Sequence, residues 1–349
     1  MATLVTTITE TLRYRGKIGQ YSWAFHRLSG LGIVLFLILH VIDTSWAAFY
    51  PELYGKAIQE YQSPLFTIGE FFLVAAVVYH AMNGLRIIFF DYRPHLWHLQ
   101  QKAAVGVFAA SAIILLPTFI IMLGHTIDFW DRPAEEREVA SLMDIIGTQS
   151  QFLLGFIVII GVALAASFVM SLINGDEREA RVVPKRPSQV DAWLWSFMRW
   201  SGVLIVPLVF GHLAMIHLIG SVFDINHAGA EVVGTTAINE SGRAAEFVGR
   251  RWDHLVAGVA VWRIYDGLLL ALVVIHGFNG LRYVVNDYAH NKIVNRAFNW
   301  AIVFGGAALI ILGMAALIAG VDETAYRIAS DLSNAASATV QNTTSPFGG

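Results

Sequence analysis

The chain has 349 residues, of which 56% are hydrophobic and only 14% are charged. A soluble domain carries about 25% charged residues, so this composition, with a mean hydropathy of +0.58, excludes an ordinary soluble globular fold. The formal net charge is -3, and the sequence contains no cysteine. Without thiols the chain cannot hold a cysteine-ligated iron–sulfur cluster, a covalently attached haem or a disulfide. Its 12 histidines are therefore the main candidate metal ligands.

Seven apolar segments are long enough to cross a bilayer, which requires about 20 residues of helix. We expect these segments at residues 24–46, 65–90, 103–123, 152–173, 194–220, 262–286 and 297–320. The fourth segment contains neither a charged residue nor a histidine. The predicted fold class is therefore all-α, a polytopic membrane helix bundle of about seven transmembrane helices.

Lysine and arginine residues are distributed unevenly between the two ends of these segments. If the N-terminus is cytoplasmic, most of the 23 basic residues lie on the cytoplasmic side, which is the distribution that the positive-inside rule describes. We therefore expect a multi-pass protein of the plasma (inner) membrane, with its N-terminus in the cytoplasm and its C-terminus outside. In this topology residues 176–187 form a charged cytoplasmic linker, and residues 221–251 form a long outer loop.

Two sequence patterns occur once in each half of the chain. Residues 25–30 and 197–202 share F-x-R-x-S-G, and a histidine follows each glycine by ten residues. Residues 80–92 and 276–288 share H-x-x-N-G-L-R-x-x-x-x-D-Y. Each half therefore repeats one three-helix unit. Two such units share the same orientation only if a further helix lies between them, and the fourth segment supplies that helix.

This repeat defines the expected domain organisation. The first three-helix repeat covers residues 1–147, and the linking helix with its cytoplasmic linker covers residues 148–190. The second three-helix repeat covers residues 191–322, and a flexible outer tail rich in small polar residues covers residues 323–349.

Histidine is rare in membrane helices, because a polar side chain in hydrocarbon is costly unless it has a partner. His80 and His276 open the same repeated motif, which suggests that they hold one shared partner from two sides. Two imidazoles can ligate the iron of a b-type haem, and filling both axial positions favours electron transfer over oxygen chemistry. Gly84 and Gly280, one turn after the histidines, leave room for a flat macrocycle beside the helix. The alternative is that each histidine hydrogen-bonds between helices.

His40 and His212 form a second candidate pair of haem ligands. Each lies 13 residues beyond the arginine of its F-x-R-x-S-G pattern, which is about 20 Å deeper along a helix. Their matched depth predicts a second haem nearer the outer face, and hydrogen bonding near the outer interface is the alternative. Arg86 and Arg282 lie about 9 Å nearer the cytoplasm than the motif histidines. There they can pair with a haem propionate or reach the interface.

Polar residues gather where the first and sixth expected helices meet the cytoplasmic side. Ser22, His26 and Arg27 open the first helix, and Asp287 and Tyr288 close the sixth. A quinone headgroup needs a hydrogen-bond donor for each carbonyl and a proton source when it is reduced, and these side-chain types can supply both. The alternative is that Arg27 is a positive-inside anchor and Tyr288 an aromatic-belt residue.

The pattern S-x-x-x-H-R-x-S-G at residues 22–30, followed by H-x-x-x-G-x-R-x-x-x-x-D at residues 80–91, resembles the cytochrome b membrane anchor of succinate dehydrogenase. The second half, with H-x-x-x-G and the Asp287-Tyr288 pair, resembles the small anchor subunit of the same complex, respiratory complex II. The similarity covers six of the seven expected helices. The chain looks like both anchor subunits of a succinate dehydrogenase or fumarate reductase joined by an extra helix.

The resemblance carries specific expectations for the site residues. His80 and His276 match the ligands of the haem nearest the iron–sulfur subunit. His40 and His212 resemble the additional ligands of dihaem members, so two haems b are expected. His26, Arg27 and Tyr288 match residues that bind the quinone, menaquinone or ubiquinone. The family serine commonly stands three residues before the histidine, where this chain has a tryptophan, and Ser22 stands one position earlier.

The resemblance also implies partners and a direction of electron flow. A flavoprotein subunit oxidises succinate, and an iron–sulfur subunit docked on the cytoplasmic face passes the electrons to the quinone. This chain then acts as a non-flavin subunit of the enzyme, with membrane lipid around it, no nucleic acid, and the option of a higher oligomer of the complex.

Two other classes of protein also fit parts of the sequence. One is the dihaem, quinone-reactive cytochrome b subunit of a hydrogenase or formate dehydrogenase, and the other is a haem-free seven-helix transporter. The F-x-R-x-S-G and Asp-Tyr patterns favour the succinate complex over the first. A transporter would more often show broken helices at the membrane midplane.

Overall fold

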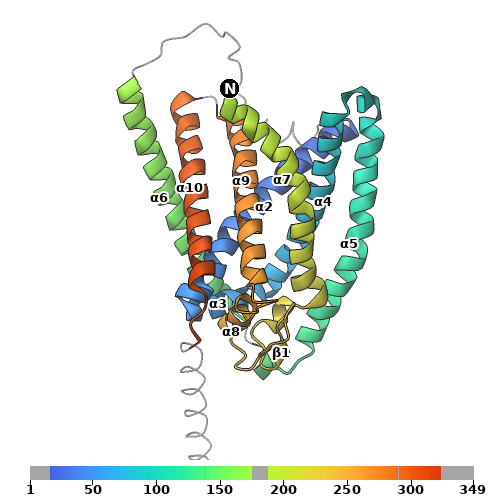
Figure 1. Ribbon diagram of the computed structural model, residues 1–349, viewed down its shortest axis with the longest axis vertical. Coiled ribbons are helices and arrows are strands. Elements are labelled where there is room, and N and C mark those ends of the chain that lie inside the picture. Colours follow the sequence, from blue (N-terminus) through green and yellow to red (C-terminus); the bar gives the residue numbers. More distant parts are fainter. Residues whose placement is uncertain (1–15, 138, 175–187, 290, 324–349) are drawn as a thin grey trace, which may run out of the picture.

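The computed structural model describes residues 16–137, 139–174, 188–289 and 291–323. The predicted linker at residues 176–187 and the predicted outer tail beyond residue 323 lie outside the described residues. Seven long helices of the described part run lengthwise through the molecule (Figure 1). They are α2 (Ile18–Phe49), α4 (Pro64–Tyr92), α5 (Gln100–Trp130), α6 (Leu142–Asn174), α7 (Gln189–Ala214), α9 (Val261–Tyr288) and α10 (Lys292–Ala319).

Shorter elements connect these helices. The 3-10 helix η1 (Pro94–Leu99) leads into α5, and a π-helical turn, η3 (Met215–Ile219), extends α7. Each predicted apolar segment matches one of the observed helices, with its ends inside the helix or within one residue of it when η3 is counted with α7. Six helices, counted over the described residues, are long and apolar enough to cross a membrane, and α6 is the long helix outside that group. The expected membrane crossing of α6 therefore stays a prediction.

Four helices form a ring at the centre of the bundle, with two contributed by each repeat. Helix α2 packs against α4 and α9, and α7 packs against the same two helices from the opposite side. Helices α5 and α10 flank the ring, and α6 lies beyond α10 at the edge of the molecule (Figure 1). The motif histidines and the F-x-R-x-S-G patterns lie on these four central helices, so the ring brings the two repeats together.

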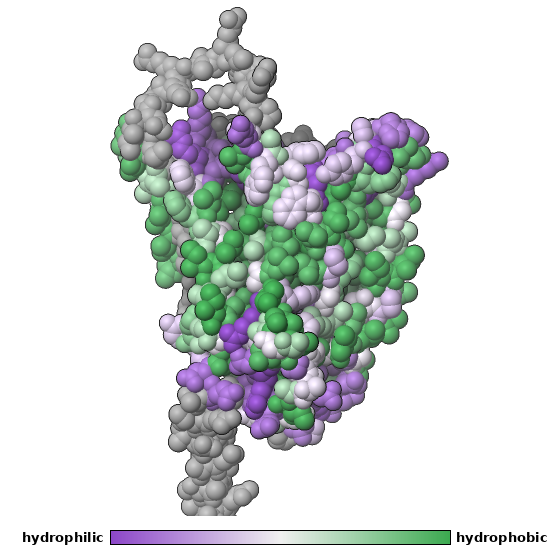
Figure 2. Space-filling view, viewed as in Figure 1, coloured by the Kyte–Doolittle hydropathy of each residue, from purple (hydrophilic) through white to green (hydrophobic). Residues whose placement is uncertain are grey.

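The bundle presents apolar side chains to its surroundings. Figure 2 shows a broad hydrophobic band around the middle, with hydrophilic residues at the two ends. Large apolar side chains such as Phe72, Ile113 and Ile318 are more than 70% exposed. Such a band is costly in water and is expected for a surface that faces lipid. The predicted fold class, an all-α polytopic membrane helix bundle, is confirmed.

The segment predicted as a long outer loop is an ordered cap at the end of the bundle opposite the start of α2. We call this part the end cap and define it as α3 (Pro51–Tyr61) together with residues 221–260. Besides α3 it contains η4 (Val222–Asp224), the antiparallel strands β1 (Ala230–Glu231) and β2 (Ile238–Asn239), and α8 (Ala244–Trp252). Its core is apolar: Phe223 stacks on Phe129 of α5 at a centroid distance of 4.4 Å, and Phe247 and Trp252 are buried beside them.

The buried carboxylate of Glu246 connects α8 to the segment that precedes it in the end cap. Glu246 is 1% exposed and accepts hydrogen bonds from the Ser241 backbone N–H at 2.9 Å and from Arg250 Nε at 3.2 Å. Burial alone would raise the pKa of Glu246, but the hydrogen bonds from Ser241 and Arg250 outweigh it, and the pKa lies below its ordinary value. Because the folded-state pKa is lowered, ionised Glu246 stabilises the folded state above the unfolded pKa. That contribution is lost as the pH falls through the folded-state pKa.

We predict that Glu246→Gln lowers the free energy of unfolding by about 1–2 kcal/mol at neutral pH, because a charge-assisted hydrogen bond is lost from a buried site. In the unsubstituted chain this contribution should fade below about pH 4, so the two proteins should converge in acid. Thermal unfolding in detergent from about pH 2 to pH 7 measures both effects. A constant difference across that range would contradict the assigned role of the carboxylate charge.

Candidate functional site

The two motif histidines are held in matching ways by the first helix of their own repeat. Ser29 Oγ on α2 lies 3.3 Å from His80 Nδ1 on α4, and Ser201 Oγ on α7 lies 2.9 Å from His276 Nδ1 on α9. His80 Nδ1 also lies 3.1 Å from the backbone carbonyl of His26, which can only accept a hydrogen bond. Nδ1 of His80 therefore carries the proton, and Nε2 keeps the lone pair that a metal requires.

The glycine after each serine lets the helices approach closely enough for this contact. A Cβ at Gly30 would lie 2.9 Å from His80 Cε1, and a Cβ at Gly202 would lie 3.6 Å from His276 Cε1. The serine of each F-x-R-x-S-G pattern thus contacts the motif histidine of the same repeat, and the glycine leaves room for its ring. Gly84 instead faces His26, at 3.7 Å from its would-be Cβ, so the side chain of His26 occupies the space that the sequence suggested for a macrocycle.

His80 lies on α4 and His276 on α9, two helices of the central ring that come from different repeats. Their Nδ1 atoms are engaged by Ser29 and Ser201, which matches the arrangement in which a second-shell hydrogen bond orients a metal-ligating imidazole. In donor type and in the engagement of Nδ1 the two residues suit a bis-histidine haem site, and the His26 ring lies in the space beside His80 in this structure. Among the described residues there is no group of three or more His, Asp or Glu side chains that could hold a metal ion.

The second pair of histidines also lies across the boundary between the repeats. The ring centroids of His40 on α2 and His212 on α7 are 6.0 Å apart, with an angle of 78° between the ring planes. Two imidazoles on opposite sides of one metal ion have ring centroids about 6 Å apart, because each metal–nitrogen bond is about 2 Å long and each centroid lies about 1 Å beyond its nitrogen. The separation of His40 and His212 therefore fits a second bis-histidine site. Phe36 stacks on His40 at 5.2 Å and makes its surroundings apolar.

The two candidate propionate partners differ in their surroundings. Arg282 donates to Asp191 at 2.9 Å and to Asn279 at 3.2 Å. By contrast, Nε and Nη1 of Arg86 are buried without a hydrogen-bond partner. An unpaired buried guanidinium is costly, so Arg86 is the member of the pair whose surroundings require an anionic partner.

Four of the five predicted quinone-site residues come together at the end where α2 begins. Arg27 forms an ion pair with Asp287 and lies 6.0 Å from the centroid of the Tyr288 ring. His26 stacks on the ring of His80 at a centroid distance of 3.9 Å, which places this cluster next to the inner histidine pair. Trp23 covers the Arg27 guanidinium at 4.3 Å.

Ser22, the fifth predicted residue, is fully buried between other side chains. Its hydroxyl donates to Asn83 Oδ1 at 2.8 Å and accepts from the Tyr79 hydroxyl at 3.0 Å. These contacts join α2 to α4 on the inside of the helix pair. The proposed contact of Ser22 with a quinone stays a prediction.

Two ion pairs connect the repeats in a symmetrical way that the sequence analysis missed. Arg27 of the first repeat pairs with Asp287 of the second, and Arg199 of the second repeat pairs with Asp91 of the first. Arg199 binds Asp91 through both Nε (3.0 Å) and Nη2 (2.7 Å) and also donates to a backbone carbonyl through Nη1. All four residues belong to the repeated patterns, so the equivalence of their positions in the sequence could have predicted both ion pairs.

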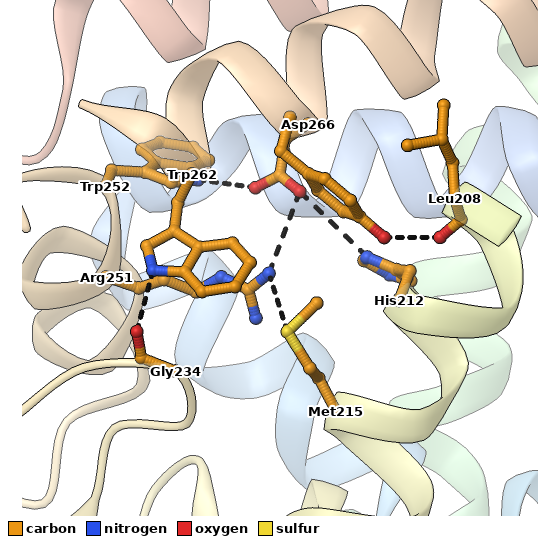
Figure 3. A network of polar contacts seen from close by, with 9 residues as sticks. Leu208, His212, Met215, Gly234, Arg251, Trp252, Trp262 and Asp266 are labelled. Atoms are coloured by element: carbon orange, nitrogen blue, oxygen red, sulfur yellow. Dashed lines mark hydrogen bonds and ion pairs between the residues drawn. The ribbon is translucent and has the colours of Figure 1, made fainter. Parts of the chain in front are cut away.

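Two further carboxylates inside the bundle were also missed. Glu70 and Asp266 each stand ten residues before a motif histidine. Glu70 lies 2.5 Å from His217 Nδ1, and Asp266 belongs to a network with His212 and with Arg251 of the end cap (Figure 3). Their equal spacing in the two repeats was the sequence signal that could have identified them.

Fold and site together define a membrane helix bundle in which two similar repeats face each other across paired histidines. A family model described as the succinate dehydrogenase/fumarate reductase transmembrane subunit matches residues 7–121 and 181–315, more than half of the chain. The chain therefore belongs to this family, and the predicted resemblance to a succinate dehydrogenase membrane anchor subunit is confirmed. The hydrogenase-type and transporter alternatives lose their support.

Two curated relatives are named as membrane subunits. The chain is 39% identical over 130 residues to the succinate dehydrogenase 2 membrane subunit SdhC of Mycobacterium tuberculosis, which covers 36% of this chain and 96% of that protein. It is 26% identical over 106 residues to the succinate dehydrogenase hydrophobic membrane anchor subunit of Halobacterium salinarum, which covers 29% of this chain and 81% of that protein. No solved structure matches the chain.

The two ion pairs between the repeats should differ in their contribution to stability. Asp91→Asn removes the negative charge from a partly buried carboxylate that accepts two hydrogen bonds from Arg199, and we expect a loss of about 1–3 kcal/mol. Asp287→Asn removes a single contact from a carboxylate that is 52% exposed, and we expect a loss below about 1 kcal/mol. Thermal unfolding of the two variants in the same detergent compares them directly. An equal loss, or a greater loss for Asp287→Asn, would contradict this ranking.

Proposed function

We propose that this chain is the haem b-containing, quinone-binding membrane anchor subunit of a succinate:quinone oxidoreductase. Within that complex it passes electrons from the iron–sulfur subunit to a membrane quinone. The observation that carries the proposal is the pairing of histidines across the two repeats, with the Nδ1 atoms of His80 and His276 held by Ser29 and Ser201. The chain contains no cysteine for a cluster, so the iron–sulfur centres belong to a partner.

Two haems b are proposed, one for each histidine pair. His80 and His276 hold the inner one through Nε2, and His40 and His212 hold the outer one. Haem b supplies reversible one-electron chemistry at a fixed depth in the membrane. Arg86 is the propionate partner of the inner site, because its guanidinium has buried donors without a partner. Arg282 is the weaker candidate, because Asp191 already neutralises it.

The quinone is proposed to bind where α2 and α9 meet, among His26, Arg27, Asp287 and Tyr288. Reduction of a quinone to a quinol takes up two electrons and two protons. The Arg27 guanidinium and the Tyr288 hydroxyl donate hydrogen bonds to the carbonyl oxygens, and His26 is the proposed proton source. Asp287 holds Arg27 in place through their ion pair, and Trp23 fixes the other side of the guanidinium.

This site determines the proposed orientation and partners. The end of the bundle that carries Arg27 and Tyr288 faces the cytoplasm, where the iron–sulfur subunit docks and the flavoprotein subunit oxidises succinate. The end cap then lies outside the plasma (inner) membrane. The distribution of basic residues in the sequence supports this orientation.

The haem assignment is tested by single histidine substitutions. The purified wild-type complex should contain two haems b per anchor polypeptide, and His80→Ala and His40→Ala should each remove one, with different absorption maxima missing from the reduced-minus-oxidised spectrum. His217→Ala is the matched control, because His217 lies in η3, directly after α7, but pairs with Glu70. A wild-type complex without haem, or haem content unchanged by both substitutions, would overturn the assignment.

The quinone assignment is tested by exploiting the internal repeat. Arg27→Gln should raise the KM for quinone about tenfold or more, because a charge-assisted hydrogen bond of about 1.5–3 kcal/mol is lost. Arg199→Gln is the matched control: it is the repeat equivalent of Arg27, but its donors are occupied by Asp91 and a backbone carbonyl. Quinone KM should change less than about twofold in this control, provided that haem content is retained. Equal effects of the two substitutions would place the quinone elsewhere.

A further inference from the structure

A buried polar network lies where α7 and α9 meet the end cap (Figure 3). Its members are His212 of α7, Asp266 of α9, and Arg251 and Trp252 of α8. Polar groups at this depth are costly unless each has a partner. The network joins a residue proposed as a haem ligand to charged residues of the end cap, and no feature of the quinone site requires it.

The geometry of Asp266 leaves one of its oxygens available to His212. Asp266 Oδ2 accepts a hydrogen bond from Trp252 Nε1 at 3.2 Å, which orients the carboxylate. Its Oδ1 is buried without a hydrogen-bond partner and lies 4.0 Å from His212 Nδ1, which is likewise buried without one. This separation is longer than a hydrogen bond, but a small rotation of either side chain or one bridging water closes it.

The neighbouring residue of α9 holds the two helices together at this level. Tyr265 donates a hydrogen bond to the backbone carbonyl of Leu208, one turn before His212 in α7 (Figure 3). A Cβ at Gly211 would lie 3.0 Å from the Tyr265 oxygen, so the glycine permits the close approach. This contact keeps Asp266 beside His212 rather than elsewhere along the helix.

Arg251 brings a positive charge from the end cap to the same carboxylate. Its side chain is 6% exposed, and its Nη2 lies 3.8 Å from Asp266 Oδ1. The same nitrogen lies 3.8 Å from the sulfur of Met215, and the guanidinium packs over the Trp262 ring at 4.5 Å. The Asp266 charge is therefore offset by a nearby cation, and the removal of either residue changes the net charge beside His212.

The first repeat has a different arrangement at the equivalent position. Glu70, the counterpart of Asp266, is paired with His217 at 2.5 Å and not with His40. The inner histidines His80 and His276 have serine hydroxyls at Nδ1. His212 is thus the proposed ligand that has a carboxylate facing its Nδ1 atom.

We propose that Asp266 is the positioning residue of the outer haem site: it accepts from His212 Nδ1–H, and together with Arg251 it sets the reduction potential of that site. The inference rests on the proposed function, because it requires His212 to be an axial ligand. A carboxylate behind a ligating imidazole makes the imidazole a stronger electron donor, which favours the oxidised state of the metal. A cation next to that carboxylate has the opposite effect.

The test is a potentiometric titration of the purified complex, followed by the absorption bands of its two haems. Asp266→Asn should raise the midpoint potential of the outer haem, with an expected shift of about tenfold in the equilibrium constant, which is about 59 mV for one electron. Arg251→Gln should lower the same potential. Asp253→Asn is the matched control, because Asp253 is a carboxylate of the same cap that pairs with Arg263 and is 44% exposed. It should leave both potentials unchanged.

The outcomes separate this inference from the function on which it rests. A wild-type complex with fewer than two haems contradicts the proposed outer site itself. Two haems, with no shift in Asp266→Asn or with shifts of the same sign in Asp266→Asn and Arg251→Gln, overturn the role of Asp266 while leaving the haem assignment intact. If Asp266→Asn does not retain haem, Asp266→Glu should keep the potential near that of the wild type. In that case a lower midpoint potential of the outer haem in Arg251→Gln supports the role of Asp266, and a higher or unchanged potential overturns it.

Discussion

The arrangement of the four central helices depends on the need of each motif histidine for a hydrogen-bond partner at its Nδ1 atom. At His80 and His276 a serine from the adjacent helix engages Nδ1, and a glycine next to that serine lets the ring approach. The other nitrogen is then left for the group that we propose to bind between the repeats. This single requirement explains why serine and glycine stand together in the F-x-R-x-S-G pattern, and why the pattern lies on the helix that precedes the motif histidine in each half.

The same patterns also hold the repeats against each other. Arginine of one repeat pairs with aspartate of the other, once as Arg27–Asp287 and once as Arg199–Asp91. The two pairs differ in their surroundings. All three guanidinium nitrogens of Arg199 donate to Asp91 or to a backbone carbonyl. The Arg27 pair is more exposed and lies next to His26 and Tyr288. The same arginine–aspartate contact thus occurs twice, with Arg199–Asp91 less exposed and Arg27–Asp287 more exposed. The proposed quinone site uses the more exposed pair.

The sequence predicted the parts of the molecule that depend on periodicity and repetition. Hydropathy located every long helix, and the two motifs identified both histidine pairs. Contacts between helices were less predictable, because spacing along one helix indicates which residues share a face but not which residue of another helix they meet. Ser29 shares a helix face with His40 by spacing, yet it contacts His80 of the neighbouring helix.

The end cap and its polar network illustrate the same limit. Residues 221–251 were expected to form a long outer loop, yet they enclose an apolar core around Phe223 and Phe247. Arg251 appeared as one of several basic residues of an outer loop, and only folding of the cap brings it to Asp266. The carboxylates ten residues before the motif histidines were detectable, but their partners come from elements distant in the sequence.

The central claim is that histidines of opposite repeats share a bound group, and an experimental density map of the whole complex tests it most directly. Two planar densities are expected, one between His80 and His276 and one between His40 and His212, each with a strong central peak in line with the imidazoles. Continuous side-chain packing or only water-sized density between both pairs, in a complex that retains its other subunits, would contradict the claim.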